Sequence, residues 1–409
     1  MLETVRSPRQ VIVGEGTAEH VPALCVQLGR RVLVVTDRVL VEQPSVQHVL
    51  GAVEEVAEHV SVFSEATAEV PLADVDAAVA VAEDARADVV LALGGGSVID
   101  LAKIVACVQT HGGEPADYYG ECRVPGPVTP LVAVPTTSGT GSEVSPVSVL
   151  TDPNLELKVG VSSPHLVAEF AVADPELTVS CPPSVTAHAG ADAFCHCVEA
   201  FTARARPRKS KDLVDGVFLG RNDVADDFAV RGVRLIAESL RPAVRDGSDL
   251  RARSAMSQAA IWGGLAFSHA GTACPHALQY PLGSATQTPH GLGVGLLLPY
   301  VLSAVRDTVA DRLAALAGVV GLDAASRSEN EAATAFIEWV GELMDDIGIP
   351  SSLAELGVAR EDVRTLAEKA SGVHRLLQNH PGATDGDTLE AILDAAWLGD
   401  RERAGVAAR

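Results

Sequence analysis

Four side chains in the middle of the chain combine the residue types and the spacing of a metal site. Asp192 and His196 lie four residues apart in a stretch of helical character, so a helix would place the carboxylate and the imidazole on one face, one turn apart. His276 and His290 come later in the chain, beside Pro and Gly residues that mark turns. One carboxylate with three imidazoles suits Fe(II) or Zn(II) and is too rich in nitrogen for Ca²⁺ or Mg²⁺. The set predicts a divalent metal ion with room for an exogenous oxygen ligand, and therefore an enzyme.

A histidine taken alone is more often a hydrogen-bonded polar residue than a metal ligand, so the prediction depends on the whole set. Cys195 and Cys197 flank His196 and at first resemble a thiolate site. On a helix, however, the two neighbours of His196 point to other faces. We therefore expect both cysteines to be packing residues.

A glycine-rich segment in the N-terminal half has the character of a phosphate-binding turn. Gly94, Gly95, Gly96 and Ser97 follow a predicted strand and begin a predicted helix. Consecutive glycines let the backbone approach a phosphate closely, and the first N–H groups of a helix favour its negative charge. The alternative is a tight turn without a ligand, because the segment lacks the full spacing of a dinucleotide-binding fingerprint.

Hydroxyl side chains gather in a second segment, Pro135–Ser145, after another predicted strand. Thr136, Thr137, Thr140 and Ser145 lie in or beside its glycines and could hydrogen-bond a pyrophosphate or a nicotinamide amide. Loops are also rich in such residues for purely conformational reasons, so this segment alone leaves both interpretations open.

An acidic residue at the end of the first predicted strand bears on the choice of cofactor. The carboxylate of Asp37 could accept hydrogen bonds from an adenosine ribose and repel a 2′-phosphate, and a solvated turn is the alternative. The first interpretation favours NAD(H) over NADP(H). Asp100 and Lys158 complete the predicted cofactor-binding set.

The predicted cofactor residues require a parallel sheet to position them, and the predicted metal ligands require helices. Helical patterns alternate with short apolar runs, typical of strands buried on both faces of a parallel sheet, at 32–37, 89–93 and 131–134. After about residue 183, Ala- and Leu-rich helical periodicity continues to the end of the chain. We predict an α/β dinucleotide-binding domain over residues 1–180 and an all-α metal-binding domain over residues 181–409.

The composition narrows the cellular setting and the partners. The chain has 409 residues, 47% of them hydrophobic, and no apolar run long enough to span a membrane. Seven cysteines without paired spacing, and a start without an apolar signal region, predict a reducing, cytoplasmic setting. A net charge of −23 disfavours nucleic acid and anionic membranes as partners. The expected partners are a small-molecule substrate and further copies of the chain, with a homodimer favoured.

One basic run stands apart in this acidic chain. The segment Arg204–Lys211 carries five positive charges in eight residues. It is either a solvated surface loop or an electrostatic funnel for an anionic substrate.

Taken in order, the motifs resemble those of one family. The sequence G-G-G-S-x-x-D-x-A-K is followed by P-T-T-x-G-T-G-S-E, by D-P-x-L-T with a later Asp and His four apart, and by two late histidines, the second in P-H-G. This combination is similar to the iron-containing (group III) alcohol dehydrogenases over nearly the whole chain. The resemblance implies a dehydroquinate-synthase-like fold and carries the family's metal ligands onto Asp192, His196, His276 and His290, with Fe(II) expected and Zn(II) as the alternative.

The chain departs from the commoner family pattern at one position. Many members have a further histidine four residues after the third metal ligand, where this chain has Tyr280. The replacement resembles the branch that contains the hydroxyacid–oxoacid transhydrogenases. We predict that Tyr280 donates a hydrogen bond to the substrate oxygen, and a packed tyrosine is the alternative. The Arg204–Asp223 region also looks longer than in the simplest members, and a flap over the cleft is the expected role of this insertion.

The resemblance implies a metal-dependent, NAD(P)-linked alcohol dehydrogenase or aldehyde reductase. Hydride would pass between a nicotinamide and a small alcohol or aldehyde, neutral or anionic, whose oxygen the metal polarises. Alternatives within the family are hydroxyacid–oxoacid transhydrogenase, maleylacetate reductase and phosphonoacetaldehyde reductase activities. A lyase like dehydroquinate synthase and a non-catalytic cofactor-binding protein are further alternatives, which the ligand set and the intact motifs disfavour.

Overall fold

The computed structural model describes residues 4–155 and 157–407, which form two compact units. The first unit comprises the residues up to Cys181 together with Arg208–Val217. The second unit comprises Pro182–Pro207 and the residues from Phe218 onward. A short segment of the chain between the first and second parts of the helical unit therefore belongs to the first unit.

The first unit is built on a six-stranded parallel sheet in the order β1-β9-β6-β4-β2-β3. The central strands are runs of Val, Leu and Ala because both faces of the sheet are covered. The strands are β1 (Gln10–Val13), β2 (Arg31–Val35), β3 (His59–Phe63), β4 (Val89–Gly94), β6 (Leu131–Pro135) and β9 (Phe170–Ala173).

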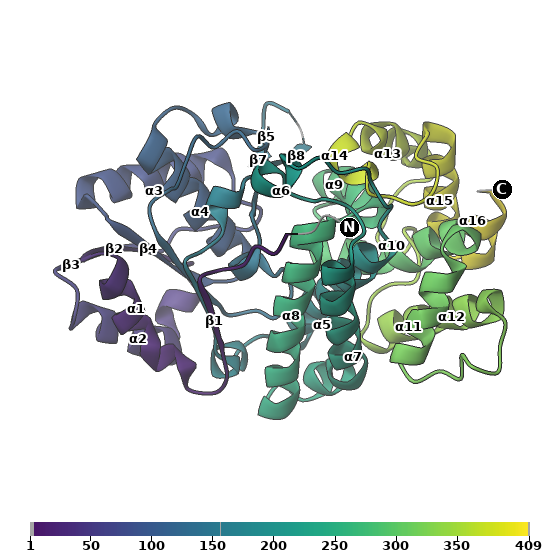
Figure 1. Cartoon of the computed structure of the whole chain (residues 1–409), viewed down its shortest axis with the longest axis horizontal. Coiled ribbons are helices and arrows are strands. Elements are labelled where there is room, and N and C mark those ends of the chain that lie inside the picture. Colours follow the sequence, from purple (N-terminus) through teal and green to yellow (C-terminus); the bar gives the residue numbers. More distant parts are fainter. Residues whose placement is uncertain (1–3, 156, 408–409) are drawn as a thin grey trace. The chain divides into compact units, whose positions relative to one another are not determined.

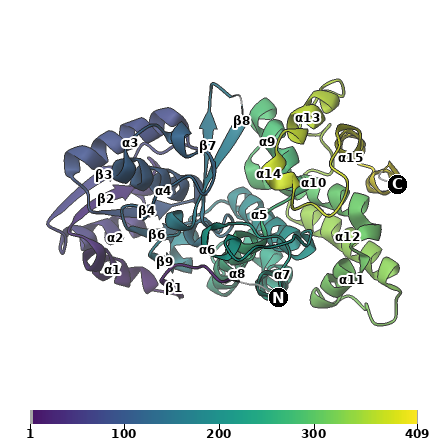
Figure 2. The same ribbon diagram turned by 45° about the horizontal axis from the view of Figure 1, so that its top comes forward.

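Helices cover the two faces of this sheet in pairs (Figures 1 and 2). Helices α1 (Val21–Leu28) and α2 (Pro44–Glu54) pack against one face, where Val34 contributes to the core. Helices α3 (Leu72–Ala85) and α4 (Gly96–His111) pack against the other face, where Leu33 contributes. Successive strand residues thus enter opposite cores, as the two-residue period of a strand requires.

A smaller sheet completes the first unit. Strands β7 (Val147–Asp152) and β8 (Leu157–Ser162) form an antiparallel hairpin, and the short strand β5 (Gly120–Glu121) pairs with β8 in parallel. The unit also contains the short helix α6 (Asp212–Asp215).

The second unit is helical, and none of its described residues belongs to a strand. Its helices are α5 (Pro183–Thr202), α7 (Asp223–Arg245), α8 (Leu250–Ala270), α9 (Cys274–Thr286), α10 (His290–Val305), α11 (Ala310–Val319), α12 (Glu329–Asp346), α13 (Asp362–Ser371), α14 (His374–Leu377), α15 (Gly386–Leu398) and α16 (Arg401–Ala407). The predicted fold class, a parallel α/β region followed by a helical region, is confirmed. Within the described part of the chain, no helix is both long enough and apolar enough to cross a membrane.

Single turns of 3-10 helix connect these elements. They lie at Thr17–His20, Leu40–Glu42, Pro115–Tyr118, Ser142–Val144, Pro164–Leu166, Pro175–Thr178 and Arg306–Thr308.

Helix α5 is the central helix of the second unit and packs against α7, α8 and α10. Its Cys197 faces glycines of two neighbouring helices: a Cβ at Gly232 would lie 2.4 Å from the Cys197 Sγ atom, and a Cβ at Gly263 would lie 3.3 Å from it. The glycines allow α7 and α8 to approach α5 around this thiol. Burial raises the pKa of Cys197 to about 12, so the thiol stays protonated and packs as a small apolar group.

Candidate active site

Three helices of the second unit bring the predicted metal ligands together. Helix α5 carries Asp192 and His196, which share a face because they are four residues apart. His276 lies in the first turn of α9, and α10 begins at His290. Since proline precedes or follows each of these helix starts, the backbone enters both helices with a fixed direction, which aims the two imidazoles toward α5.

The three imidazoles surround one carboxylate oxygen of Asp192. The Asp192 Oδ1 atom lies 3.5, 3.4 and 3.6 Å from the Nε2 atoms of His196, His276 and His290, respectively. The Nε2 atoms of His196 and His276 are 3.1 Å apart. These separations suit a shared ion, because ligand atoms about 2.1 Å from one tetrahedral metal are about 3.4 Å from each other. Asp192, His276 and His290 each offer a ligand atom within 4.8 Å of the other two, so these three fit a single divalent cation, and His196 lies beside them.

The electrostatics of the cluster also favour a cation. Burial alone would raise the pKa of Asp192, but His196, His290 and His276 lower it below its usual value, so the carboxylate is ionised. The side chains of Asp192, His196 and His276 are at most 6% exposed, whereas that of His290 is 31% exposed. The site is therefore closed on three sides and accessible beside His290.

Glu199 contacts the cluster and was not among the residues predicted from the sequence. Its Oε2 atom lies 2.5 Å from Nδ1 of His276, and its Oε1 atom accepts a hydrogen bond of 2.9 Å from the backbone N–H of Ala273. This contact leaves Nε2 of His276 directed at Asp192, as in sites where a carboxylate orients a metal-binding imidazole. The spacing on α5 contains a signal for it, because Glu199 follows His196 by three residues and therefore shares its face.

Two aromatic side chains lie beside the cluster. The rings of Phe267 and His196 are 4.4 Å apart between centroids, and Phe267 is buried, so it forms an apolar wall. Tyr280 lies one turn after His276 on α9 and is 5% exposed. Its hydroxyl oxygen accepts a hydrogen bond of 3.2 Å from Nη2 of Arg375. Tyr280 is thus one helical turn from the cluster, with a cation as its neighbour.

The glycine-rich turn and the hydroxyl-rich segment meet in the first unit. Gly94 ends β4 and Gly96 begins α4, while the hydroxyl-rich segment follows β6, the strand paired with β4. A Cβ at Gly96 would lie 2.4 Å from the Thr140 side chain, and a Cβ at Gly95 would lie 3.5 Å from Oγ1 of Thr137. Since parallel sheets bind nucleotides at the carboxyl ends of their strands, this edge is the place where a cofactor phosphate would be expected.

The other predicted cofactor residues lie around this edge or beneath it. Asp37 follows β2, and its Oδ1 atom accepts hydrogen bonds from the N–H groups of Val39 at 2.9 Å and Leu40 at 2.8 Å, so it also caps a turn. Lys158 is ion-paired with Glu69 at 2.7 Å. Six of these residues are half-buried, namely Gly95, Gly96, Ser97, Asp100, Thr137 and Thr140, whereas Thr136 and Ser145 are buried.

A buried lysine ties the hydroxyl-rich segment to α4. The Nζ atom of Lys103 donates to the carbonyl oxygens of Ser145 and Val147 at 2.8 Å each and to the Ser142 and Ser145 hydroxyls at 3.2 Å each. Asp100, one turn earlier on α4, accepts a hydrogen bond of 2.9 Å from the N–H of Val149 and another from Ser142. Asp100 and Ser145 thus use their polar atoms in hydrogen bonds that hold the hydroxyl-rich segment to α4.

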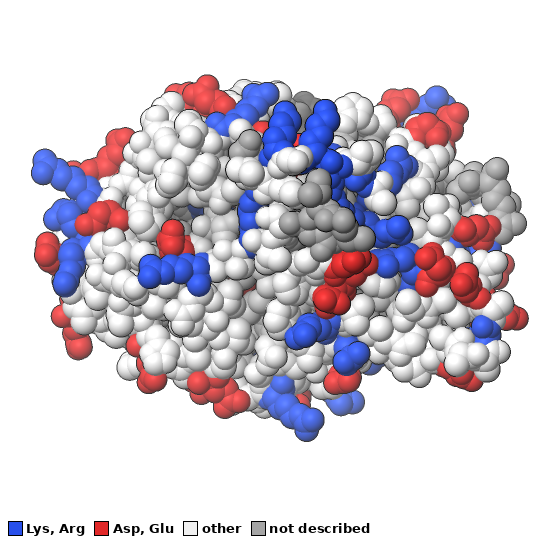
Figure 3. Space-filling model, viewed as in Figure 1, with Lys and Arg blue, Asp and Glu red and all other residues white. Residues whose placement is uncertain are grey.

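The basic run is divided between the two units. Arg204 donates to the carbonyl of Gly382 at 2.9 Å, and Arg206 donates to the carbonyl of Phe218 and to Oδ1 of Asn379 at 3.0 Å each. Both arginines therefore bind backbone and amide oxygens of the second unit, whereas residues from Arg208 to Lys211 belong to the first. On the face drawn in Figure 3, basic side chains gather in the upper middle part of the view, whereas acidic and basic side chains are interspersed over the rest.

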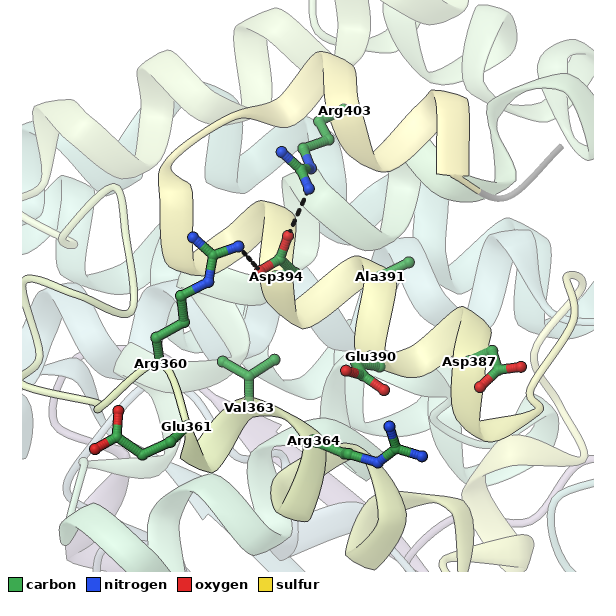
Figure 4. A pocket seen from close by; sticks show the side chains of 9 residues that line it. All are labelled: Arg360, Glu361, Val363, Arg364, Asp387, Glu390, Ala391, Asp394 and Arg403. Carbon is green, nitrogen blue, oxygen red and sulfur yellow. Dashed lines mark hydrogen bonds and ion pairs between the residues drawn. The ribbon is translucent and has the colours of Figure 1, made fainter.

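A surface pocket elsewhere in the second unit has a different character. Figure 4 shows it between α13, α15, which contains Asp394, and α16, which contains Arg403, with Arg360 in the turn before α13. Asp394 pairs with Arg360 at 2.8 Å and with Arg403 at 2.9 Å. The pocket is thus lined by charges of both signs that pair with one another, and none of its lining residues is a histidine or cysteine.

Family models match both halves of the chain. The model described as iron-containing alcohol dehydrogenase matches residues 8–175. The model described as Fe-containing alcohol dehydrogenase family, C-terminal, matches residues 186–397.

Individual proteins match over nearly the full length. Long-chain-alcohol dehydrogenase 1 of Geobacillus thermodenitrificans (strain NG80-2) is 37% identical over 392 residues, which are 95% of this chain and 95% of that relative. The crystal structure of 1,3-propanediol oxidoreductase has a TM-score of 0.91 at 30% identity, covering 97% of this chain and 100% of that one. The structure of sulfoacetaldehyde reductase from Bifidobacterium kashiwanohense in complex with NAD+ has a TM-score of 0.83 at 27% identity, covering 97% and 99%.

These matches confirm the resemblance that the motifs indicated, together with the fold and the oxidoreductase class that it implied. The chain belongs to the iron-containing alcohol dehydrogenase family.

Proposed function

We propose that this protein is an NAD(H)-dependent alcohol dehydrogenase or aldehyde reductase that holds one divalent metal ion, Fe(II) in preference to Zn(II). The observation that carries the proposal is the convergence of the His196, His276 and His290 Nε2 atoms on Oδ1 of Asp192 at 3.4 to 3.6 Å. Family membership supports iron, and the NAD+ complex of the sulfoacetaldehyde reductase supports a nicotinamide cofactor.

The protein's own side chains would prepare the reaction around that ion. When bound, a divalent ion supplies Lewis acidity to an alcohol or carbonyl oxygen. Glu199 holds His276 with Nε2 toward the ion, and Phe267 excludes water beside His196. Tyr280 would donate its phenolic hydrogen to the substrate oxygen during reduction and recover it during oxidation.

The cofactor would bind at the carboxyl edge of the parallel sheet. The backbone N–H groups at Gly95–Ser97 lie at the start of α4, where the helix dipole favours a pyrophosphate. Thr137 and Thr140 lie beside them and would add hydroxyl donors. Asp37 would accept hydrogen bonds from the adenosine ribose, which favours NAD(H) over NADP(H).

Metal analysis of three variants tests the ligand set. We expect His276→Ala and His290→Ala to lose most of the bound metal and all turnover while remaining folded, because three ligands hold an ion far less tightly than four. His48→Ala is the control, because His48 is exposed on α2 in the first unit. Full metal occupancy in both ligand variants, measured by elemental analysis, would refute the assignment.

Cofactor oxidation tests the reaction itself. We expect the metal-loaded protein to oxidise NADH when simple aldehydes are added and to reduce NAD+ with the corresponding alcohols. A dehydroquinate-synthase-like lyase would show no net change in NADH, and a non-catalytic binding protein would bind NADH without consuming it. Either result with a fully loaded protein contradicts the proposed function.

A further inference from the structure

We propose that Arg375 binds an anionic group on the substrate, so that the enzyme prefers aldehydes and alcohols that carry a carboxylate or a comparable oxyanion. The inference rests on the proposed function and assigns a substrate class to the same site. It depends on the position of Arg375 beside Tyr280, on its aromatic support, and on its lack of an acidic partner.

The position of Arg375 links it to the metal site within one unit. Arg375 lies in α14, and its Nη2 atom donates a hydrogen bond of 3.2 Å to the Tyr280 hydroxyl. Tyr280 follows the metal ligand candidate His276 by one turn of α9. A substrate whose oxygen reaches Tyr280 would therefore place its neighbouring carbons next to the guanidinium.

An aromatic ring fixes the guanidinium in this position. The Arg375 Cζ atom lies 5.5 Å from the centroid of the Phe218 ring, which is a cation–π contact. Phe218 is 3% exposed and has a φ of +55°, a conformation that non-glycine residues rarely adopt. Such backbone strain persists only where the surroundings impose it and is commonest at ligand sites.

Hydrogen bonds hold the strained segment against the chain that leads into α9. The N–H of Leu219 donates to the carbonyl of His269 at 2.6 Å, and the N–H of Gly220 donates to the carbonyl of Ala270 at 3.1 Å. Three residues later, the N–H of Ala273 is bonded to Glu199. The contacts that position Arg375 and those that orient His276 are thus linked through the same stretch of chain before α9.

The charge of Arg375 is not balanced by the protein. Among residues 4–155 and 157–407, no carboxylate is ion-paired with Arg375, although the chain has 54 Asp and Glu against 31 Lys and Arg. The residue is half-buried, so its charge loses part of its hydration. Of its five N–H donors, one is engaged with Tyr280, and a carboxylate or tetrahedral oxyanion can accept two others at once. A neutral substrate could not form an ion pair with this guanidinium.

Matched pairs of aldehydes test the proposal on the metal-loaded full chain. The probes are glyoxylate against acetaldehyde and 4-oxobutanoate against pentanal, each with NADH, and the measured quantity is the ratio of kcat/KM for the anionic over the neutral member. We expect the unmodified enzyme to prefer at least one anionic member. Arg375→Met should lower that preference roughly 30- to 100-fold, since one charged, two-point hydrogen bond is lost. Arg375→Lys should restore part of it, because it keeps the charge and loses the planar fork.

A second charge-removing variant separates local recognition from the general field. Arg364→Met removes one positive charge from α13, where Arg364 is exposed and pairs with Glu368 at 3.2 Å. Its preference should equal that of the unmodified enzyme. Competitive inhibition by butanedioate against a neutral aldehyde provides a readout that needs no anionic turnover, and it should weaken in Arg375→Met and not in Arg364→Met. Metal content and thermal melting confirm that each variant is folded.

The outcomes distinguish this proposal from the proposed function. If no aldehyde supports NADH oxidation by the loaded enzyme, the proposed function fails first. If neutral aldehydes are preferred, or if Arg375→Met reduces both members of a pair equally, the enzyme activity stands and anion recognition is wrong. A rise in the KM for NADH in Arg375→Met, with the aldehyde preference unchanged, would assign Arg375 to a cofactor phosphate and also overturn the proposal.

Discussion

Glu199 determines which nitrogen of His276 faces the candidate metal site. Its carboxylate lies 2.5 Å from Nδ1, which places a proton on that nitrogen and leaves Nε2 to face the cluster. Burial lowers the pKa of His276, and Glu199 and Asp192 together raise it, the net value being about 9. One face of α5 thus supplies an acidic ligand, an imidazole and the residue that orients a second imidazole.

Removal of the Glu199 carboxylate should weaken the metal site without removing a ligand. We expect Glu199→Ala to lower the affinity for Zn²⁺ roughly 10- to 100-fold, the usual effect of losing an orienting partner, and Glu199→Gln to have a smaller effect. Titration against a competing chelator measures this. Glu238→Gln, on the exposed face of α7, is the control. An unchanged affinity in Glu199→Ala would show that packing alone orients His276.

Replacement of Tyr280 should affect all substrates alike. We expect Tyr280→Phe to lower kcat on the order of 10- to 100-fold for neutral and anionic aldehydes, with metal content unchanged, because a hydrogen bond to developing charge is lost. The effect of Arg375→Met should differ, because that substitution should lower the efficiency with anionic aldehydes more than with neutral ones. Rates equal to those of the unmodified enzyme would make Tyr280 a packing residue that leaves proton transfer to another group.

The four ligand candidates could be predicted from the sequence because these residue types are unusual at that spacing. The residues that contact them and Tyr280 from elsewhere in the chain could not. Asp192 and His196 share a helix face by local geometry alone. Arg375 meets Tyr280 across 95 residues of chain, and Glu199 meets Ala273 across 74, so neither contact leaves a pattern within a single element. Contacts of this kind depend on how the helices pack.

At the scale of elements, α4 and the hydroxyl-rich segment act as one piece because of a buried group of charges. Lys103 and Glu143 are buried, and Asp100 beside them is half-buried. Burial raises the pKa of Glu143 to about 7 and lowers that of Lys103 to about 8, and each shift is opposed by the attraction between the two. The protonation of the groups that hold the hydroxyl-rich segment to α4 is therefore expected to change near neutral pH.

Stability should fall as Glu143 ionises. Its pKa rises from 4.5 to about 7 on folding, so the folded chain binds the proton more tightly, and the stability this gives at low pH is lost as pH rises through 7. We expect Glu143→Gln to become more stable relative to the unmodified protein between pH 5 and 7.5, by up to about 3 kcal/mol. Differences in Tm on the order of 5 °C would report it. Glu54→Gln, on exposed α2, should show no such trend.

Cofactor choice belongs to the turn after β2. If Asp37 contacts the adenosine ribose, its negative charge repels the 2′-phosphate of NADP(H). We expect Asp37→Gly to raise the ratio of kcat/KM for NADPH over NADH at least 10-fold. Equal efficiency with both cofactors in the unmodified enzyme, or an unchanged ratio in the variant, would reduce Asp37 to the turn-capping role that its bonds to Val39 and Leu40 already give it.

Strands that are apolar throughout were predictable, whereas the small sheet was not. The residues of β4 and β6 are buried on both faces and read as continuous apolar runs. Strand β7 mixes Ser and Thr with Val and depends on pairing with β8, so its local pattern is weak. Lys103 was likewise hidden, since a lysine on a helix is usually exposed and this one is buried by bonds to a segment some 40 residues away.

For the whole molecule, the metal ion would join helices that begin far apart in the chain. Without it, a buried carboxylate and three imidazoles would lack their common partner, so its removal should lower the Tm. An ion present at 1,000 times its Kd contributes about 4 kcal/mol. We expect a chelator to lower the Tm of the unmodified protein by several degrees and to leave His290→Ala nearly unchanged. The metal content should be measured in both samples, to confirm that the site is full without the chelator and empty with it. An equal Tm in the two samples would mean that the helical unit is fully folded without the metal ion.

The order in which the chain is made has a consequence for its first unit. Arg6 donates a hydrogen bond of 2.8 Å to the carbonyl of Leu213 and further bonds to the carbonyls of Val214 and Gly216, which all lie in the Arg208–Val217 segment. A ribosome must therefore synthesise α5, the helix that carries two of the candidate metal ligands, before the α/β unit can complete its own contacts. A fragment cut after Cys181 would leave Arg6 without these acceptors, so an exchange of the α/β unit between relatives that keeps them must include the Arg208–Val217 segment as well.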